Sequence, residues 1–107
     1  MRFSYQKEKF NVARCCLMLP HTNGDAHSIM EAFRECGHAL HDFDRSLLDD
    51  DAQSWVRRLE EFMNTDGLSD PEEKGLWQVK AETLNHDEKI ELSNIIDELA
   101  HWFARDD

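Results

Sequence analysis

Glycine and proline are scarce in this chain, which has four glycines and two prolines among 107 residues. This excludes collagen-like and low-complexity sequences, and four scattered glycines do not form a phosphate-binding loop. Long hydrophobic runs are also missing, since no stretch approaches the roughly 18 apolar residues of a membrane-spanning helix. Segment 12–19 resembles a signal-peptide core, but Arg14 interrupts it and no small-residue cleavage site follows. The sequence therefore predicts a cytoplasmic protein.

Cysteine is too rare to provide a disulfide framework. Cys15 and Cys16 are adjacent and would rarely bond to each other, and Cys36 stands alone. An odd number of cysteines without a framework predicts reduced thiols that are buried as small hydrophobic side chains. A reactive or metal-bound thiol is the alternative. No Cys-x-x-Cys occurs, so a structural zinc site has little support from the sequence.

Basic residues are outnumbered only in the second half of the chain. Residues 1–45 hold six basic and six acidic residues, whereas residues 46–107 hold six basic and seventeen acidic residues, which accounts for the net charge of −11. Direct nucleic-acid binding is disfavoured, because phosphate contacts need clustered Lys or Arg. A concentrated negative surface instead attracts a partner with a basic face.

These charges predict a non-enzymatic interaction protein that binds a basic protein partner through its acidic second half, as a nucleic-acid mimic or a regulatory subunit. A solvated surface that only keeps the protein in solution is the competing interpretation. Some carboxylates have local roles, since those of 49–51 lie in the first turn of a predicted helix. Glu60-Glu61 follow Arg57-Arg58 at the spacing of salt bridges within a helix. The expected partner-binding residues are Asp70, Glu72, Glu73, Glu91, Asp97 and Glu98.

Apolar residues recur every third or fourth position, which is the spacing of helices. Each predicted long helix therefore has an apolar stripe that we expect in the core. The stripes are Phe10, Val12, Ala13, Cys16, Leu17 and Leu19 in the first helix, Ile29, Phe33, Cys36 and Leu40 in the second, Trp55, Leu59, Phe62 and Met63 in the third, and Leu92, Ile95, Ile96, Leu99, Trp102 and Phe103 in the last. Asn85 and Glu88 form a capping box before the last helix, and the segment starting at Asp70-Pro71 has the signature of a helix start. Residues 75–84 fit either a strand or a short helix, and we favour the helix because no second strand is nearby. The sequence predicts an all-α fold, a small bundle in one domain over residues 1–107, with four main helices over 5–19, 25–42, 47–64 and 85–103 and one short helix.

Two Glu-x-x-His steps, Glu35–His38 and Glu98–His101, are typical of bundles that hold two metal ions. A metal-dependent helical-bundle enzyme is therefore the alternative function. Turning each helix by about 100° per residue directs all four side chains away from the apolar stripes, toward water. His41 follows His38 by three positions, so this pair could hold a surface metal ion. The four histidines in the first half of the chain could together sense pH. We favour ordinary surface residues and predict no cofactor and no catalytic residue.

Two aromatic residues end the last predicted helix, Trp102 and Phe103. Tryptophan is enriched at binding hot spots, and helix ends often fray in monomers. Burial of this pair by a second copy would make the protein a homodimer. Packing within one chain is the commoner explanation.

Overall fold

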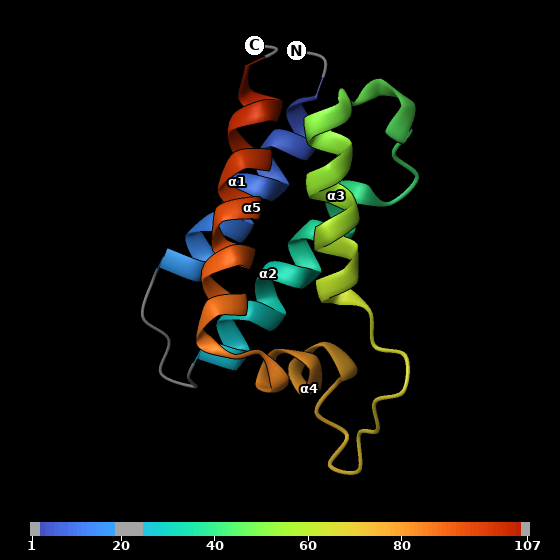
Figure 1. Cartoon of the computed structure of the whole chain (residues 1–107), viewed down its shortest axis with the longest axis vertical. Coiled ribbons are helices and arrows are strands. Elements are labelled where there is room, and N and C mark those ends of the chain that lie inside the picture. The colour runs from blue at the N-terminus through green and yellow to red at the C-terminus, as the bar shows by residue number, and fades with distance from the viewer. Residues whose placement is uncertain (1–2, 19–24, 106–107) are drawn as a thin grey trace.

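The computed structural model describes residues 3–18 and 25–105, and all regular secondary structure in these ranges is helical (Figure 1). This confirms the predicted all-α class. No helix in the described ranges is both long and apolar enough to cross a membrane. The helices are α1 (Ser4–Met18), α2 (Asp25–Leu40), α3 (Asp50–Met63), α4 (Leu76–Thr83) and α5 (His86–Ala104), and one turn of 3-10 helix, η1 (Arg45–Leu47), precedes α3.

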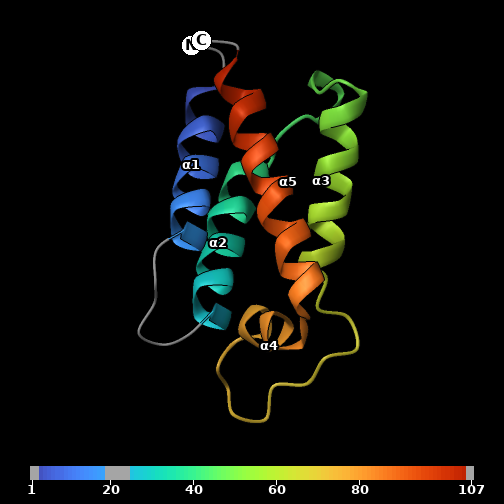
Figure 2. The same ribbon diagram turned by 60° about the vertical axis from the view of Figure 1, so that its left-hand side comes forward.

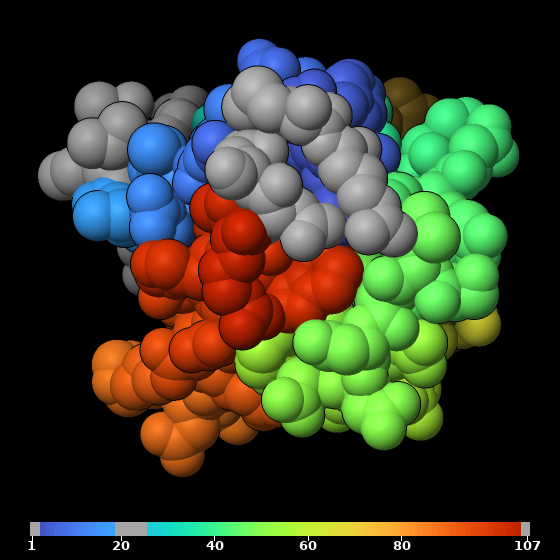
Figure 3. Space-filling model, turned by 90° about the horizontal axis from the view of Figure 1, so that it is seen from above, coloured from blue at the N-terminus to red at the C-terminus, as the bar shows by residue number. Residues whose placement is uncertain are grey.

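Helix α5 lies between the α1–α2 pair and α3. It packs against α1 and against α3, and α1 also packs against α2. From above, the end of α5 lies between α1 and α3 (Figure 3). Helix α4 lies across the lower end, where it contacts α2 and α3 (Figure 2). By contrast, α2 and α3 share little close backbone contact, and a surface hollow lined by residues of both helices leaves this side of the fold open.

The predicted apolar stripes of the second and last helices form much of the core. Ile29, Phe33, Cys36 and Leu40 of α2 are all buried, which confirms that stripe. Each large apolar side chain that is fully buried contributes roughly 1.5–3 kcal/mol to folding. The buried side chains of α5 are Leu92, Ile95, Ile96, Leu99, Ala100 and Phe103.

The stripes of the other two long helices are shifted from the prediction. Val12, expected in the core, is 40% exposed, because α1 packs through Phe10 and Ala13 and Val12 points away from that face. On α3 the predicted Trp55 and Met63 are only partly buried. The fully buried residues of α3 are Ala52, Val56, Leu59 and Phe62.

The start predicted at Asp70-Pro71 is wrong, because this segment forms a turn. The Asp70 carboxylate accepts hydrogen bonds from the backbone N–H groups of Lys74, at 2.9 Å, and Gly75, at 2.7 Å. Glu73 and Gly75 have positive φ angles of 54° and 98°, which a right-handed helix does not allow. Helix α4 begins only at Leu76, and it confirms the short helix favoured for 75–84.

The other helix boundaries differ from the sequence limits at identifiable residues. Helix α2 ends at Leu40 rather than at 42, because Asp42 adopts a φ of 57°. Helix α3 begins after Asp49, whose side chain accepts a hydrogen bond from the Ala52 N–H at 2.9 Å. The predicted end of the first helix, residue 19, lies outside the described residues. The capping box of α5 is confirmed, with both reciprocal hydrogen bonds between Asn85 and Glu88 present.

Candidate functional site

Acidic side chains line the outer surface where α3 and α5 run side by side. Positions separated by four and seven residues lie on one face of a helix. On α3 and on α5, one such face carries exposed or half-exposed side chains and borders the neighbouring helix. We call this surface the acidic seam. It consists of Asp51, Ser54, Arg58 and Glu61 on α3 and of Asp87, Glu91, Asn94 and Glu98 on α5.

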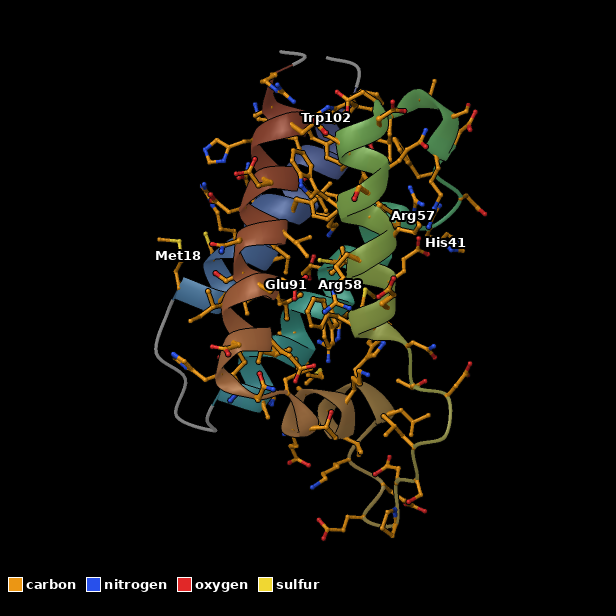
Figure 4. The ribbon with its side chains drawn as sticks, in the orientation of Figure 1. Met18, His41, Arg57, Arg58, Glu91 and Trp102 are labelled. Carbon is orange, nitrogen blue, oxygen red and sulfur yellow. The ribbon has the colours of Figure 1, made fainter. Side chains whose placement is uncertain are left out.

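Two contacts set the antiparallel register of the seam. The Trp102 indole N–H donates to an Asp49 carboxylate oxygen at 2.9 Å, and Arg58 contacts Glu91 further along (Figure 4). This register brings Asp51 to the level of Glu98. The carboxylates at that end of the seam therefore come from both helices.

Arg58 is the one cation among the seam positions. Its guanidinium donates from Nε and Nη2 to the two carboxylate oxygens of Glu91, at 2.7 and 3.0 Å, and from Nη1 to Glu61 at 2.8 Å. It also lies over the Phe62 ring, 4.4 Å from the ring centroid. The guanidinium holds the pKa of Glu91 below its usual range and has its own pKa raised.

Three seam carboxylates, Asp51, Asp87 and Glu98, have no cation partner within the described part of the chain. Arg58 is already occupied by Glu61 and Glu91, so it does not neutralise them. Charges this exposed interact weakly with single partners, but a row of them can orient a cationic surface.

The six expected partner-binding residues do not share one surface. Glu91 and Glu98 lie in the seam, whereas Asp97 faces α1, where Arg14 lies 3.4 Å from its carboxylate. The other three are in the loop before α4. Asp70 holds the turn, Glu72 lies 3.6 Å from the Lys74 ammonium, and Glu73 is exposed. Asp51 and Asp87 belong to the seam but were not among the six expected residues, because the sequence does not show which acidic positions of α3 and α5 face the same surface.

The two Glu-x-x-His steps are not brought together. Glu35, expected to face water, instead faces α1, where its carboxylate lies 3.4 Å from the Lys9 ammonium and its side chain is only 20% exposed. His38 is exposed on α2, whereas Glu98 and His101 are exposed on α5.

His41 lies beside the Asp42 carboxylate at 3.3 Å, and His101 contacts the Asp97 backbone oxygen at 2.9 Å. These contacts are local to each helix end. Among the described residues, no three His, Cys, Asp or Glu side chains lie close enough to hold a metal ion.

A groove lies on the open side of the fold, between α2 and α3, with α4 at its end. Its largest hollow has a volume of about 640 Å³ and is lined by Gly37, His41, Arg57, Met63 and Trp77, among others. In Figure 4, Arg57 and His41 lie on the side of α3 that faces away from α5. We call the groove between these two helices the α2–α3 groove. The sequence did not predict this groove; only Arg34 and His38, four residues apart, share a face of α2 by helical spacing.

Trp102 and Phe103 are packed by their own chain. The Phe103 side chain has no exposed surface, and its ring centroid lies 5.2 Å from that of Phe10 and 5.3 Å from that of Phe3. Trp102 is partly buried and its indole N–H is bound by Asp49. The burial of Phe103 therefore does not require a second copy.

The three cysteines are free and differ in exposure. Cys36 is buried in the core, and burial strongly raises the pKa of its thiol. Cys16 is partly buried, and burial together with Glu31 and Glu35 raises its pKa. Cys15 is exposed, which corrects the expectation that all three are buried, because it lies on the outer face of α1.

Comparisons with protein-family models, with curated proteins and with solved structures give no match. The chemistry of the site follows from its own geometry. Charged carboxylates without partners attract cations, and in the seam three such groups lie on one outer surface. The acidic seam is therefore the candidate functional site.

Proposed function

We propose that this chain is a small helical bundle of four long helices and one short helix, and that it acts as a non-enzymatic interaction protein. It binds a basic protein partner through the acidic seam. The observation that carries this proposal is that Asp51, Asp87 and Glu98 lie on one face without a cation. As a regulatory subunit or nucleic-acid mimic, the chain would occupy the basic face of its partner.

The pairing pattern supports the seam over the rest of the acidic half. Several carboxylates elsewhere are used within the molecule: Asp70 holds a turn, Glu82 lies 2.9 Å from the Lys74 ammonium, and Asp97 lies next to Arg14. Asp66 and Glu73 also have no cation among the described residues, but they lie in the loop before α4 and not in a row along two helices. Only unpaired charges are available to a partner without first breaking a contact. In the seam, Arg58 fixes Glu61 and Glu91, so the charged surface is partly ordered before binding.

The experiment compares two charge-matched variants in extracts of the source cells. The seam variant carries Asp51→Asn, Asp87→Asn and Glu98→Gln. The control variant carries Glu8→Gln, Glu72→Gln and Glu73→Gln, which removes the same charge elsewhere. Captured proteins are quantified by mass spectrometry at low and high salt, and melting curves check that both variants fold.

We expect one basic protein, or a few, to be captured by the wild type and the control variant and lost from the seam variant. High salt should also release them, because screening weakens contacts between exposed charges. Equal capture by the seam and control variants, or capture that salt does not change, would show that the seam is not the binding face.

A further inference from the structure

The α2–α3 groove collects basic side chains in a protein that is acidic overall. Arg34 and His38 lie on one face of α2, His41 follows just after the end of that helix, and Arg45 begins η1. Arg57 comes from α3 on the other side. Each of these five residues lines at least one of three hollows in the groove. The largest hollow shares lining residues with each of the other two.

The arginines within the described helices divide into two groups. Arg14, Arg45 and Arg58 each lie within 3.4 Å of a carboxylate oxygen. Arg34 donates only to the Met30 sulfur, at 3.4 Å, and Arg57 is exposed and has no partner in the described part of the chain. Both arginines without a carboxylate line the α2–α3 groove.

The acidic residues of the groove are mostly engaged. Glu60 binds Arg45 at 3.1 Å, and Glu61 binds Arg58 at 2.8 Å. Asp66 is the acidic lining residue whose carboxylate has no cation among the described residues. Among the Arg, Asp and Glu side chains of the groove, two arginines and one carboxylate are therefore left without an oppositely charged partner.

An aromatic surface closes the groove at α4. The Trp77 indole N–H donates to the Met63 carbonyl at 3.1 Å, and its ring lies near Phe33, with centroids 6.5 Å apart. Gly37 lets the ring approach α2, since a Cβ there would lie 3.2 Å from the Trp77 Cη2 atom. The held ring and the Met63 side chain provide apolar surface beside the free arginines.

We propose that the α2–α3 groove binds an acidic peptide segment of a protein partner. An aromatic or aliphatic side chain of that segment packs on Trp77, and its carboxylates contact Arg34 and Arg57. The joined, open hollows suit an extended or helical chain better than an enclosed small molecule. This site is separate from the acidic seam and has the opposite charge preference.

The test follows binding by NMR with isotopically labelled protein, using the Trp77 indole and Gly37 amide signals as reporters. Three capped peptides are compared: Glu-Glu-Leu-Phe-Glu-Glu, Lys-Lys-Leu-Phe-Lys-Lys and Glu-Glu-Ser-Ser-Glu-Glu. A single-stranded oligonucleotide is the fourth probe. The test variant is Arg34→Gln/Arg57→Gln, and Lys80→Gln/Arg105→Gln removes the same charge outside the groove.

We expect the Glu-Leu-Phe peptide to shift both reporter signals, with the Ser peptide binding more weakly and the Lys peptide not at all. The Arg34→Gln/Arg57→Gln variant should bind roughly five- to tenfold more weakly, and the control should match the wild type. The proposal is overturned if no peptide shifts the reporters, if both variants bind alike, or if only the oligonucleotide occupies the groove. The seam variant should leave this binding unchanged, so failure here is separate from failure of the seam proposal.

Discussion

Single polar side chains connect helices that are far apart in sequence. Asp49 both begins α3 and binds the indole of Trp102 near the end of α5. Arg58 joins the middle of α3 to Glu91 of α5. The sequence indicates the local half of each role, a helix start and an intrahelical pair with Glu61. The contacts between helices could not be predicted, because they depend on the register of α3 against α5.

Asp49 should make the free energy of unfolding sensitive to acid. The Trp102 indole and the Ala52 N–H lower the pKa of its carboxyl. A lowered folded-state pKa stabilises the protein fully above about pH 4, the unfolded value, and this contribution is lost as the pH falls below it. Asp49→Asn keeps a side chain that can cap the helix but removes the carboxyl group that changes charge with pH. In urea denaturation the variant should lose stability less steeply below about pH 4; identical slopes would contradict the assignment.

The cysteines should react in the order of their exposure. Cys15 is exposed, Cys16 is half-buried with a raised pKa, and Cys36 is buried in the core. In native protein treated with iodoacetamide, we expect modification of Cys15 first and of Cys36 only after unfolding, because the thiolate is the reactive form. Peptide mapping over a time course measures this order. Early modification of Cys36 would mean that the core opens locally.

At the scale of helices, the spacing of residues in the sequence correctly predicted the features that depend on residues close to one another in the chain. The stripes of α2 and α5 and the capping box at Asn85 were correct, because the residues that define them are close in sequence. The start of α4 was not, because Asp70 binds N–H groups of a turn that ends in Gly75. The groove could not be predicted either, since it depends on α2 and α3 lying apart while α4 contacts both.

Phe103 should be among the most costly positions to truncate. It is fully buried where α1, α5 and the segment before η1 meet, with Phe10, Phe3 and Phe43 around it. Phe103→Ala should lower the free energy of unfolding by about 3–5 kcal/mol, because it leaves a cavity. Trp102→Phe tests the neighbouring, partly buried position and should cost less. Similar losses at both positions in chemical denaturation would argue against this packing.

At the scale of the whole molecule, the charge imbalance is distributed unevenly over the surface. The sequence predicted that the second half is acidic, but ion pairs formed on folding decide which carboxylates remain available. Arg58, Lys74 and Arg14 engage several of them, and the unpaired seam carboxylates lie on the α3–α5 surface. The α2–α3 groove lies on another face, with two arginines free. A basic and an acidic ligand would therefore bind at different places.

The most direct measurement of the seam's role is photo-cross-linking from its centre. A photoreactive amino acid replaces Asn94, an uncharged seam residue, or Tyr5, which is 50% exposed on α1. In extracts of the source cells, Asn94 should cross-link to a basic protein at low salt, and the adduct should disappear at high salt and be absent from Tyr5. No adduct at Asn94, or the same adducts from both positions, would contradict binding through the acidic seam.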